Sequence, residues 1–206
     1  LMKRLADAGQ KVITATILDR PWNGQTEDPY GSMVTKTLKK NGSWEYGYEV
    51  FDKWVEFMMS LGIDQQINCY SMIPWKLEFD YIDEATGQQK SIKADPSSND
   101  YKIYWMSFIS DFAKHLREKG WFDITTIAMD ERPMHAMQKA MAVIRKADPS
   151  FKVSLAGNWH PEIEADLYDY CIALDQAELV PQEVLTRRQS EGKKTTVYTC
   201  CSTHKP

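Results

Sequence analysis

Two adjacent acids, Asp130 and Glu131, stand between an apolar run and a proline in the segment Met129-Asp130-Glu131-Arg132-Pro133. The apolar run has the composition of a buried strand, so both acids follow its carboxyl end. Neighbouring carboxylates repel each other, which raises the proton affinity of one, so that one acts as an acid while the other stays charged. The pair therefore predicts acid–base catalysis. The alternative is a helix start, where acids are favourable beside the positive end of the helix dipole.

Aromatic and amide residues recur at the ends of other predicted strands. The flat faces of indole rings stack on sugars, and amides bind sugar hydroxyls, so carbohydrate chemistry fits these surroundings. The candidate substrate-binding residues near strand ends are Trp22, Asn23, Tyr70, Trp75, Asn158, Trp159, His160 and Tyr198. Each tryptophan taken alone has a structural alternative as a core residue, because tryptophan is highly buried on average. Strand parity leaves open whether Tyr70 and Tyr198 face the site or the core.

The elements that must position these residues alternate along the chain. Runs of apolar and β-branched residues predict six strands, at 11–18, 65–72, 124–129, 152–156, 170–174 and 195–200. Helical periodicity predicts helices at 49–61, 101–119, 134–146, 162–167 and 181–191, after the end of a helix at 1–9. The polar segment 19–48 is predicted to be a long loop, and residues 76–94 alternate about an Ala-Thr-Gly turn and predict an inserted β-hairpin.

Strands that alternate with helices predict βαβ units and a parallel sheet, either closed into a barrel or doubly wound. A complete (β/α)8 barrel typically needs about 250 residues, and this chain has 206. We expect a (β/α)8 TIM barrel present as an incomplete barrel that lacks roughly its first and last strands. Residues 1–206 would form a single catalytic domain, the barrel fragment, with the hairpin inserted at about 76–94.

The composition of the chain argues against several classes of function. The chain has 25 basic and 29 acidic residues, a net charge of −4 and no basic tail, so nucleic acid is not an expected partner. It contains no run of about 20 apolar residues, so no membrane interaction is expected. Four cysteines without C-x-x-C spacing predict buried thiols, and strain disfavours a disulfide between the adjacent Cys200 and Cys201. Localisation stays open; a periplasmic or secreted location follows if a signal peptide precedes this segment.

Several motifs together resemble glycoside hydrolase family 123, and the resemblance covers essentially all 206 residues. That family resembles retaining β-N-acetylgalactosaminidases whose central barrel lies between β-sandwich domains. The motifs that carry the resemblance are Asp19-Arg20-Pro21-Trp22-Asn23-Gly24-Gln25-Thr26 with Asp28-Pro29-Tyr30, Phe51-Asp52-Lys53-Trp54-Val55-Glu56-Phe57-Met58, Ala128-Met129-Asp130-Glu131-Arg132-Pro133 and Ala156-Gly157-Asn158.

The resemblance implies removal of terminal β-linked N-acetylgalactosamine by substrate-assisted catalysis, one of the known exceptions to the two-carboxylate scheme of glycosidases. Glu131 matches the family's general acid/base, and Asp130 matches the acid that holds the acetamido N–H. The implied partners are a glycan substrate, either a glycosphingolipid or a glycoprotein oligosaccharide, and flanking β-sandwich domains of the intact protein. No cofactor and no metal are implied. Without the flanking parts, we expect the fragment to be inactive or unstable.

Two other functions remain as alternatives. A metal-dependent barrel hydrolase would use Asp130, Glu131, His160 and His204 as ligands, although no H-x-H or H-E-x-x-H spacing supports it. A non-catalytic carbohydrate-binding barrel would explain the aromatic residues. It would not explain the acid pair, because a binding module has no need for adjacent carboxylates facing a glycosidic oxygen.

Overall fold

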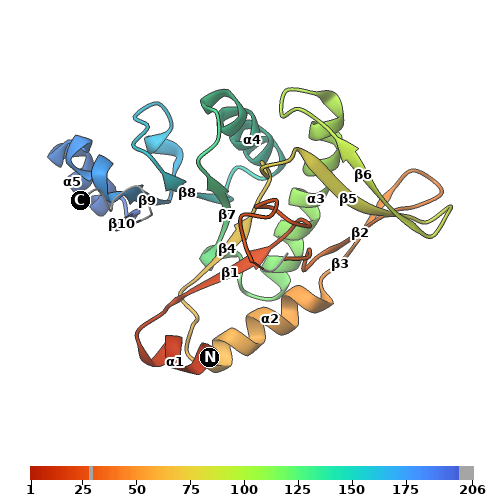
Figure 1. Ribbon diagram of the computed structural model, residues 1–206, viewed down its shortest axis with the longest axis horizontal. Helices are drawn as coiled ribbons and strands as arrows, with labels where there is room; N and C mark the ends of the chain where they lie inside the picture. Colours follow the sequence, from red (N-terminus) through yellow and green to blue (C-terminus); the bar gives the residue numbers. More distant parts are fainter. Residues whose placement is uncertain (28–29, 200–206) are drawn as a thin grey trace.

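In a computed structural model that describes residues 1–27 and 30–199, six parallel strands form one sheet in the order β1-β4-β7-β8-β9-β10 (Figure 1). They are β1 (Val12–Thr16), β4 (Gln66–Tyr70), β7 (Thr125–Asp130), β8 (Lys152–Gly157), β9 (Asp169–Ala173) and β10 (Lys194–Tyr198). Every neighbouring pair is parallel. All six predicted strands are confirmed, with ends within two residues of the expected positions.

Helix α1 (Met2–Asp7) precedes the first strand of this sheet; the parallel strands after it are joined by helices, except that β8 and β9 are joined through a 3₁₀ turn. The helices that follow are α2 (Glu49–Ser60), α3 (Asn99–Glu118), α4 (Met134–Ala147) and α5 (Gln182–Ser190), with 3₁₀ turns η1 (Phe122–Ile124), η2 (Glu164–Asp166) and η3 (Leu174–Leu179). The short helix predicted at 162–167 is only the 3₁₀ turn η2. Among the described residues, no helix combines the length and apolar character needed to cross a bilayer.

The longest helix, α3, shows how local sequence sets the element boundaries. The hydroxyl of Ser98 caps its first turn by accepting a hydrogen bond from the backbone N–H of Tyr101 at 3.2 Å. Gly120 follows its end with φ +73°, a conformation that favours glycine. Between these ends, an apolar stripe that includes Trp105, Ile109 and Phe112 is fully buried.

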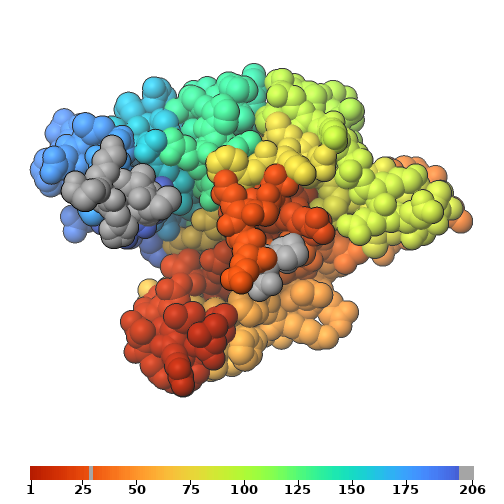
Figure 2. All heavy atoms as spheres, viewed as in Figure 1, coloured from red at the N-terminus to blue at the C-terminus, as the bar shows by residue number. Residues whose placement is uncertain are grey.

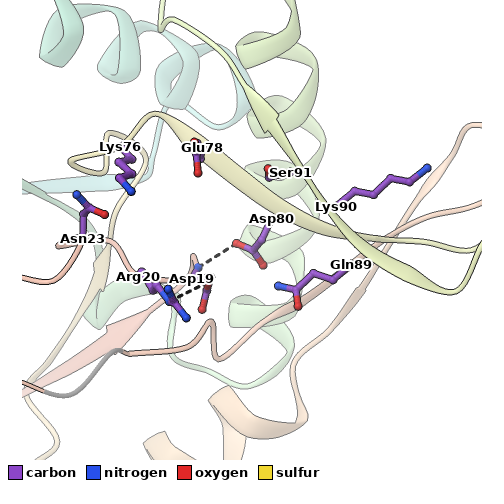
Figure 3. A pocket seen from close by; sticks show the side chains of 9 residues that line it. All are labelled: Asp19, Arg20, Asn23, Lys76, Glu78, Asp80, Gln89, Lys90 and Ser91. Carbon is purple, nitrogen blue, oxygen red and sulfur yellow. Dashed lines mark hydrogen bonds and ion pairs between the residues drawn. The ribbon is translucent and has the colours of Figure 1, made fainter.

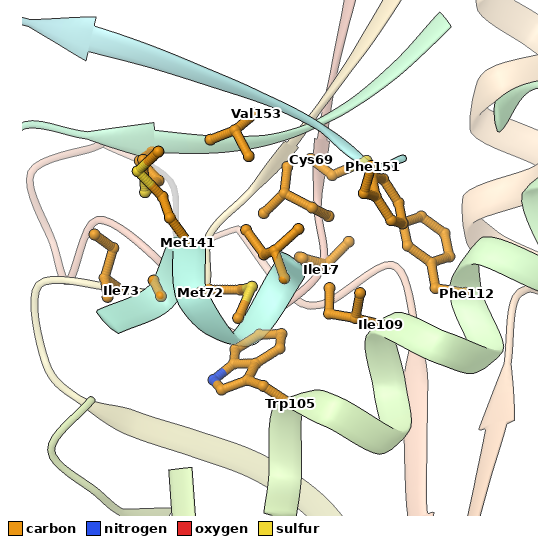
Figure 4. Close-up of a cluster of buried hydrophobic side chains, with 14 of the residues drawn as sticks. Ile17, Cys69, Met72, Ile73, Trp105, Ile109, Phe112, Met141, Phe151 and Val153 are labelled. Atoms are coloured by element: carbon orange, nitrogen blue, oxygen red, sulfur yellow. The ribbon is translucent and has the colours of Figure 1, made fainter. Parts of the chain in front are cut away.

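The core lies between this stripe and one face of the parallel sheet (Figure 4). Alternate strand residues such as Cys69 and Val153 point into it, together with Met141 of α4. Burying these side chains is worth roughly 25 cal/mol per Å² of apolar surface, which makes this face the main source of stability.

The opposite face of the sheet is polar. Thr126 of β7 donates a hydrogen bond to Oδ1 of Asn68 of β4 at 2.9 Å, and its hydroxyl lies 2.7 Å from that of Ser154 of β8. Because side chains alternate along a strand, Asp130 lies on the same polar face as Thr126. Tyr70 likewise shares this face with Asn68. The fold therefore collects the polar strand ends on one face.

The predicted incomplete (β/α)8 TIM barrel is wrong as a fold class for this chain. The six parallel strands form a curled sheet whose edge strands, β1 and β10, are not paired with each other. A second, separate sheet of mixed direction stands beside it. The βαβ pattern determines that neighbours run parallel, but closure depends on strand number, tilt and stagger, which the pattern does not contain.

The second sheet has the order β3-β2-β5-β6, formed by β2 (Thr35–Leu38), β3 (Trp44–Gly47), β5 (Glu78–Asp83) and β6 (Gln88–Lys93). Strands β5 and β6 pair antiparallel and are the hairpin expected at 76–94. The prediction of a loop throughout 19–48 is wrong, because β2 and β3 lie within it. The sheet packs on α3, where Trp44 meets Tyr104 edge-on with ring centroids 5.4 Å apart.

Candidate active site

Asp130 is the last residue of β7 and pairs in register with Ala156 of β8. Its carboxylate atom Oδ2 accepts a hydrogen bond from Nε1 of Trp22 at 2.8 Å. Trp22 comes from the loop after β1, so this bond joins two parts of the chain that are 108 residues apart. The ring of Trp22 is itself held between Tyr30 and Tyr70, with centroids 5.6 Å and 5.4 Å away.

The pKa of Asp130 is raised above its ordinary value. The largest cause is burial, which disfavours the charged form, while the hydrogen bond from Trp22 and the charge of Arg132 act in the opposite direction. The sequence predicted that repulsion between the two acids would raise one pKa. The pKa that is raised is that of Asp130, the acid that the resemblance assigns to the acetamido group, and the cause is burial rather than the neighbouring carboxylate.

Glu131 is held separately, by Asn158 at the end of β8. The backbone N–H of Asn158 donates to Oε2 at 3.0 Å, and its side-chain amide donates to Oε1 at 2.6 Å. Nε2 of His160 lies 3.8 Å from Oε1, and the Glu131 side chain is 40% exposed. The two acids therefore have different hydrogen-bond partners, although they are neighbours in the sequence.

The close approach of Glu131 to β8 depends on Gly157. A Cβ atom at that position would lie 3.0 Å from Cβ of Glu131 and 3.3 Å from its Oε2. Such a contact is tighter than ordinary van der Waals packing, so a side chain at this position would push Glu131 aside by a few tenths of an ångström. Gly157 belongs to the Ala156-Gly157-Asn158 motif, but the sequence analysis assigned no role to it.

Tyr170 of β9 holds the turn after β8 in place. The sequence analysis placed Tyr170 in a strand but assigned no role to it. Its hydroxyl donates to the carbonyl of Asn158 and accepts from the backbone N–H of His160 at 2.7 Å. The ring of Trp159 stacks on Tyr170, with centroids 5.6 Å apart. No sequence signal marks this arrangement, because it depends on how β8 and β9 lie side by side.

Trp75 is tied to the site through Arg132. The guanidinium lies over the Trp75 ring, 4.7 Å from its centroid, and the indole side chain is exposed. The backbone N–H of Trp75 donates to the carbonyl of Pro21 at 3.0 Å, which brings the segments after β1 and β4 together on the surface (Figure 2). Arg132 had no role in the sequence interpretation, although it belongs to the acid-pair motif.

The remaining candidate substrate-binding residues lie at different distances from the two acids. Burial, and then the charge of Asp130, raise the pKa of Tyr70, and Tyr198 at the end of β10 also acts on Tyr70 electrostatically. Asn23 lines a separate cavity with Asp19 and the hairpin. The structure thus brings Trp22, Tyr70, Asn158 and His160 around the acids, while Trp159 packs on Tyr170 and Asn23 points elsewhere. His204, Cys200 and Cys201 lie outside the described residues, as do Asp28 and Pro29.

Two buried nitrogen atoms next to the acids, Nε of Arg132 and Nε2 of His160, have no hydrogen-bond partner within the described part of the chain. Buried polar atoms are normally paired, so these two are exceptions beside the acids. In residues 1–27 and 30–199, no group of three or more His, Cys, Asp or Glu side chains is placed to hold a metal ion. The arrangement offers two carboxylates with different hydrogen-bond partners, together with aromatic rings.

Comparisons with known proteins point to one family. The family model described as glycoside hydrolase 123, catalytic domain, matches residues 1–206. The structure of a family 123 glycoside hydrolase from Clostridium perfringens, analysed for its hydrolysis of glycolipid glycans, is similar at 33% sequence identity with a TM-score of 0.87. The match covers 97% of this chain and 37% of that chain, so this chain spans little more than a third of the relative's length. A comparison with curated proteins finds no match.

Proposed function

Because the chain belongs to glycoside hydrolase family 123, we propose that residues 1–206 form the catalytic unit of a retaining exo-glycosidase. Its substrate is a glycan that ends in β-linked N-acetylgalactosamine. The relative from Clostridium perfringens hydrolyses glycolipid glycans, and we extend that substrate class, the glycosphingolipids, to this chain. The flanking β-sandwich domains stay a prediction.

The observation that carries the proposal is the separation of the two acids. Asp130 has a raised pKa and accepts a hydrogen bond from the indole of Trp22, whereas Glu131 is held by the backbone and the side-chain amide of Asn158. Two carboxylates in different environments suit two different tasks in one reaction. Adjacent strand residues point to opposite faces, but both reach one site here because the strand ends at this point.

In the first step, the carbonyl oxygen of the substrate's own 2-acetamido group attacks the anomeric carbon. The bond from that carbon to the leaving oxygen breaks, and Glu131 gives its proton to the leaving oxygen. The product is an oxazolinium ion, whose N–H donates to the carboxylate of Asp130. That hydrogen bond stabilises the positive charge that develops on the nitrogen.

In the second step, water attacks the anomeric carbon from the face that the leaving group has vacated. Glu131, now a carboxylate, takes a proton from the water, and the oxazolinium ring opens to restore the acetamido group. Two inversions at the anomeric carbon give retention. No nucleophile from the protein is needed.

Asn158 can hold Glu131 in both protonation states that this cycle requires. Its side-chain amide has a donor and an acceptor at opposite ends. The NH2 group donates to the carboxylate form, as observed at Oε1. After the amide turns over, its oxygen accepts a hydrogen bond from the protonated form, while the backbone N–H remains on Oε2.

The test is inhibition of the intact protein by a 2-acetamido-derived thiazoline of galacto configuration, a stable mimic of the oxazolinium intermediate. Intermediate mimics bind much more tightly than substrates. We expect inhibition well below the KM of an aryl β-N-acetylgalactosaminide, together with a β-configured first product in NMR spectra. If the protein turns over the aryl substrate but millimolar thiazoline leaves the rate unchanged, the substrate-assisted assignment is wrong.

A further inference from the structure

The chain contains two Asn-Gly dipeptides, Asn23-Gly24 in the loop after β1 and Asn41-Gly42 in the turn between β2 and β3. Asparagine is one of the chemically labile residues of proteins. It is most labile before glycine, because the missing Cβ leaves the glycine backbone nitrogen free to reach the side-chain amide. The reaction is spontaneous deamidation, and each dipeptide is a candidate for it.

Deamidation proceeds in two steps with water as the only co-reactant. The backbone nitrogen of the glycine attacks Cγ of the asparagine, so that an N–Cγ bond forms and the Cγ–Nδ2 bond breaks. The glycine N–H proton leaves with Nδ2 as ammonia, and a five-membered succinimide ring remains. Water then opens the ring at either carbonyl carbon, which gives aspartate or isoaspartate, whose main chain runs through Cβ and Cγ. The glycine N–H and the asparagine side chain must therefore be free to meet.

At Asn41-Gly42 both reacting groups are held by hydrogen bonds. The backbone N–H of Gly42 donates to the carbonyl of Lys39 at 2.9 Å. Oδ1 of Asn41 accepts from the backbone N–H and from the hydroxyl of Ser43, at 3.0 Å and 2.7 Å. The side chain and the nitrogen cannot meet until these bonds break, so the turn protects this dipeptide.

At Asn23-Gly24 the surrounding turn is fixed, but the reacting groups are not. The backbone N–H of Gln25 donates to the carbonyl of Trp22 at 3.0 Å, and φ is +44° at Asn23 and +81° at Gly24. This is the pattern of a type I′ turn, which favours Asn-Gly because both central residues need positive φ. Within the part of the chain that the structure describes, neither the N–H of Gly24 nor the side-chain amide of Asn23 has a hydrogen-bond partner. The turn thus requires the labile dipeptide and leaves it unprotected.

Water has access to this dipeptide, because Asn23 and Gly24 are both exposed. Asn23 also lines a cavity of about 450 Å³, together with Glu78 of β5 and Ser91 of β6 (Figure 3). A succinimide formed here is therefore open to hydrolysis.

The residue before this dipeptide is Trp22, which donates to Oδ2 of Asp130 at 2.8 Å. An isoaspartate at position 23 adds one atom to the main chain directly after Trp22. The turn from Trp22 to Gln25 then no longer closes with the same geometry, and the indole moves relative to Asp130. Because a hydrogen bond weakens steeply when it is misaligned, the bond from Trp22 to Asp130 is lost.

We propose that Asn23 deamidates spontaneously through a succinimide with Gly24, and that its isoaspartate product releases Trp22 from Asp130. Asn41 stays intact for much longer in the folded protein. The modification stands on the geometry of the loop alone, whereas its effect on turnover rests on the proposed function.

The first experiment follows both dipeptides by peptide mass spectrometry in the intact protein, kept at mildly alkaline pH either folded or unfolded in urea. Unfolding removes the hydrogen bonds of the turns, so the urea sample gives the reference ratio of the two rates. Relative to that ratio, we expect the folded protein to favour reaction at Asn23 over Asn41 by about tenfold, the effect of two ordinary hydrogen bonds. A folded ratio no larger than the ratio in urea would overturn the inference, as would an Asn23 that stays intact while the urea sample reacts.

The second experiment measures turnover of an aryl β-N-acetylgalactosaminide by the isoaspartate form, separated by chromatography from the aspartate product and the unmodified protein. Its control is Asn23→Asp, which adds the same charge and keeps the normal main chain. We expect kcat/KM of the isoaspartate form to lie about tenfold to a hundredfold below that of Asn23→Asp, the effect of losing a hydrogen bond to a charged group.

Equal values for these two proteins would overturn the release of Trp22 and leave the modification site standing. If the unmodified protein does not cleave the aryl glycoside, the proposed function fails, and the effect on turnover fails with it. Mass spectrometry decides in either case whether Asn23 is the residue that deamidates.

Discussion

Nε1 of Trp22 lies 2.8 Å from Oδ2 of Asp130 and donates a hydrogen bond to it. The bond joins the loop after β1 to the end of β7, across the intervening strand β4. It lowers the pKa of Asp130 against the larger, opposite effect of burial. One side chain therefore both positions this loop and favours the ionised form of the carboxylate.

Trp22→Phe tests this relationship. The variant keeps an aromatic ring between Tyr30 and Tyr70 but loses the donor, so the pKa of Asp130 should rise further. Since the mechanism needs the charged form of Asp130, the acid limb of the kcat/KM profile should move to higher pH. We expect activity at neutral pH to fall by about tenfold to a hundredfold, the size of a hydrogen bond to a charged group.

The control is Trp54→Phe, which removes the indole donor that bonds to the carbonyl of Thr14 at 2.9 Å, away from the acids. Its pH profile should match that of the wild type. A Trp22→Phe enzyme with an unshifted acid limb would show that the indole bond does not control the ionisation of Asp130.

Glu131→Gln should separate catalysis from binding. The amide keeps the shape of the side chain and can still accept from the backbone of Asn158, but it cannot donate a proton and take one back. General acid–base groups contribute typically 10²- to 10⁴-fold, so we expect kcat on a poor leaving group to fall by about a thousandfold. The thiazoline should keep its affinity within a few fold, as measured by calorimetry.

The exposed Glu183 of α5 provides the matched control, because Glu183→Gln removes a carboxylate far along the chain from the acid pair. It should leave kcat unchanged. Wild-type turnover by Glu131→Gln would instead show that Glu131 is not the general acid/base of the reaction.

Asp130→Asn should have a different signature. The asparagine can still accept the hydrogen bond from Trp22, but it has no charge to stabilise the oxazolinium ion. We therefore expect both kcat and thiazoline affinity to fall, each by roughly a hundredfold, since an electrostatic partner of a developing charge is worth about 3 kcal/mol. Unchanged affinity for the thiazoline would assign the acetamido contact to another residue.

The strands and the acid pair could be predicted from the sequence because both are local. The apolar run from Ile124 to Met129 predicts a buried strand from its own composition. Pro133 indicates that the strand ends shortly after this run. Predictions that depended on which strands pair with each other were less accurate. The strands β2 and β3 have four residues each and only one fully buried side chain, that of Lys36, so their sequence reads as loop.

The supports of the acid pair could not be predicted for a similar reason. Asn158 and Tyr170 act on Glu131 and on each other through the register of β7, β8 and β9, which hydrophobic periodicity does not specify. A comparison of motifs can mark Gly157 as part of the family pattern. Only the three-dimensional arrangement gives the physical reason, the 3.0 Å approach of Glu131.

Gly157→Ala is accordingly expected to reduce activity without unfolding the protein. The added methyl group would displace Glu131 from the amide of Asn158, and a displacement of about 1 Å can cost a hundredfold in rate. Gly47→Ala is the matched control on a strand, because its nearest neighbour, Cβ of Thr35, is 3.5 Å away and allows an ordinary contact. Equal activity of the two variants in the aryl glycoside assay would refute this role of Gly157.

Lys36 should make stability depend on pH in an unusual direction. Burial lowers its pKa from 10.5 to about 8, against the opposing charges of Asp80 and Asp19. Between these two values the unfolded chain binds a proton that the folded chain has released, so the contribution of Lys36 to the free energy of unfolding rises with pH. The slope for a single group is about 1.4 kcal/mol per pH unit.

The measurement is urea unfolding of the wild type and Lys36→Met at pH 7.5 and at pH 10 in the same salt, taken as the difference between the two proteins so that other groups cancel. We expect the wild type to gain stability relative to Lys36→Met on going to the higher pH, because the buried ammonium is the form that burial disfavours. A pH-independent difference would mean that Lys36 keeps its proton in the folded protein throughout this window, and that Asp19 and Asp80 compensate its burial in full.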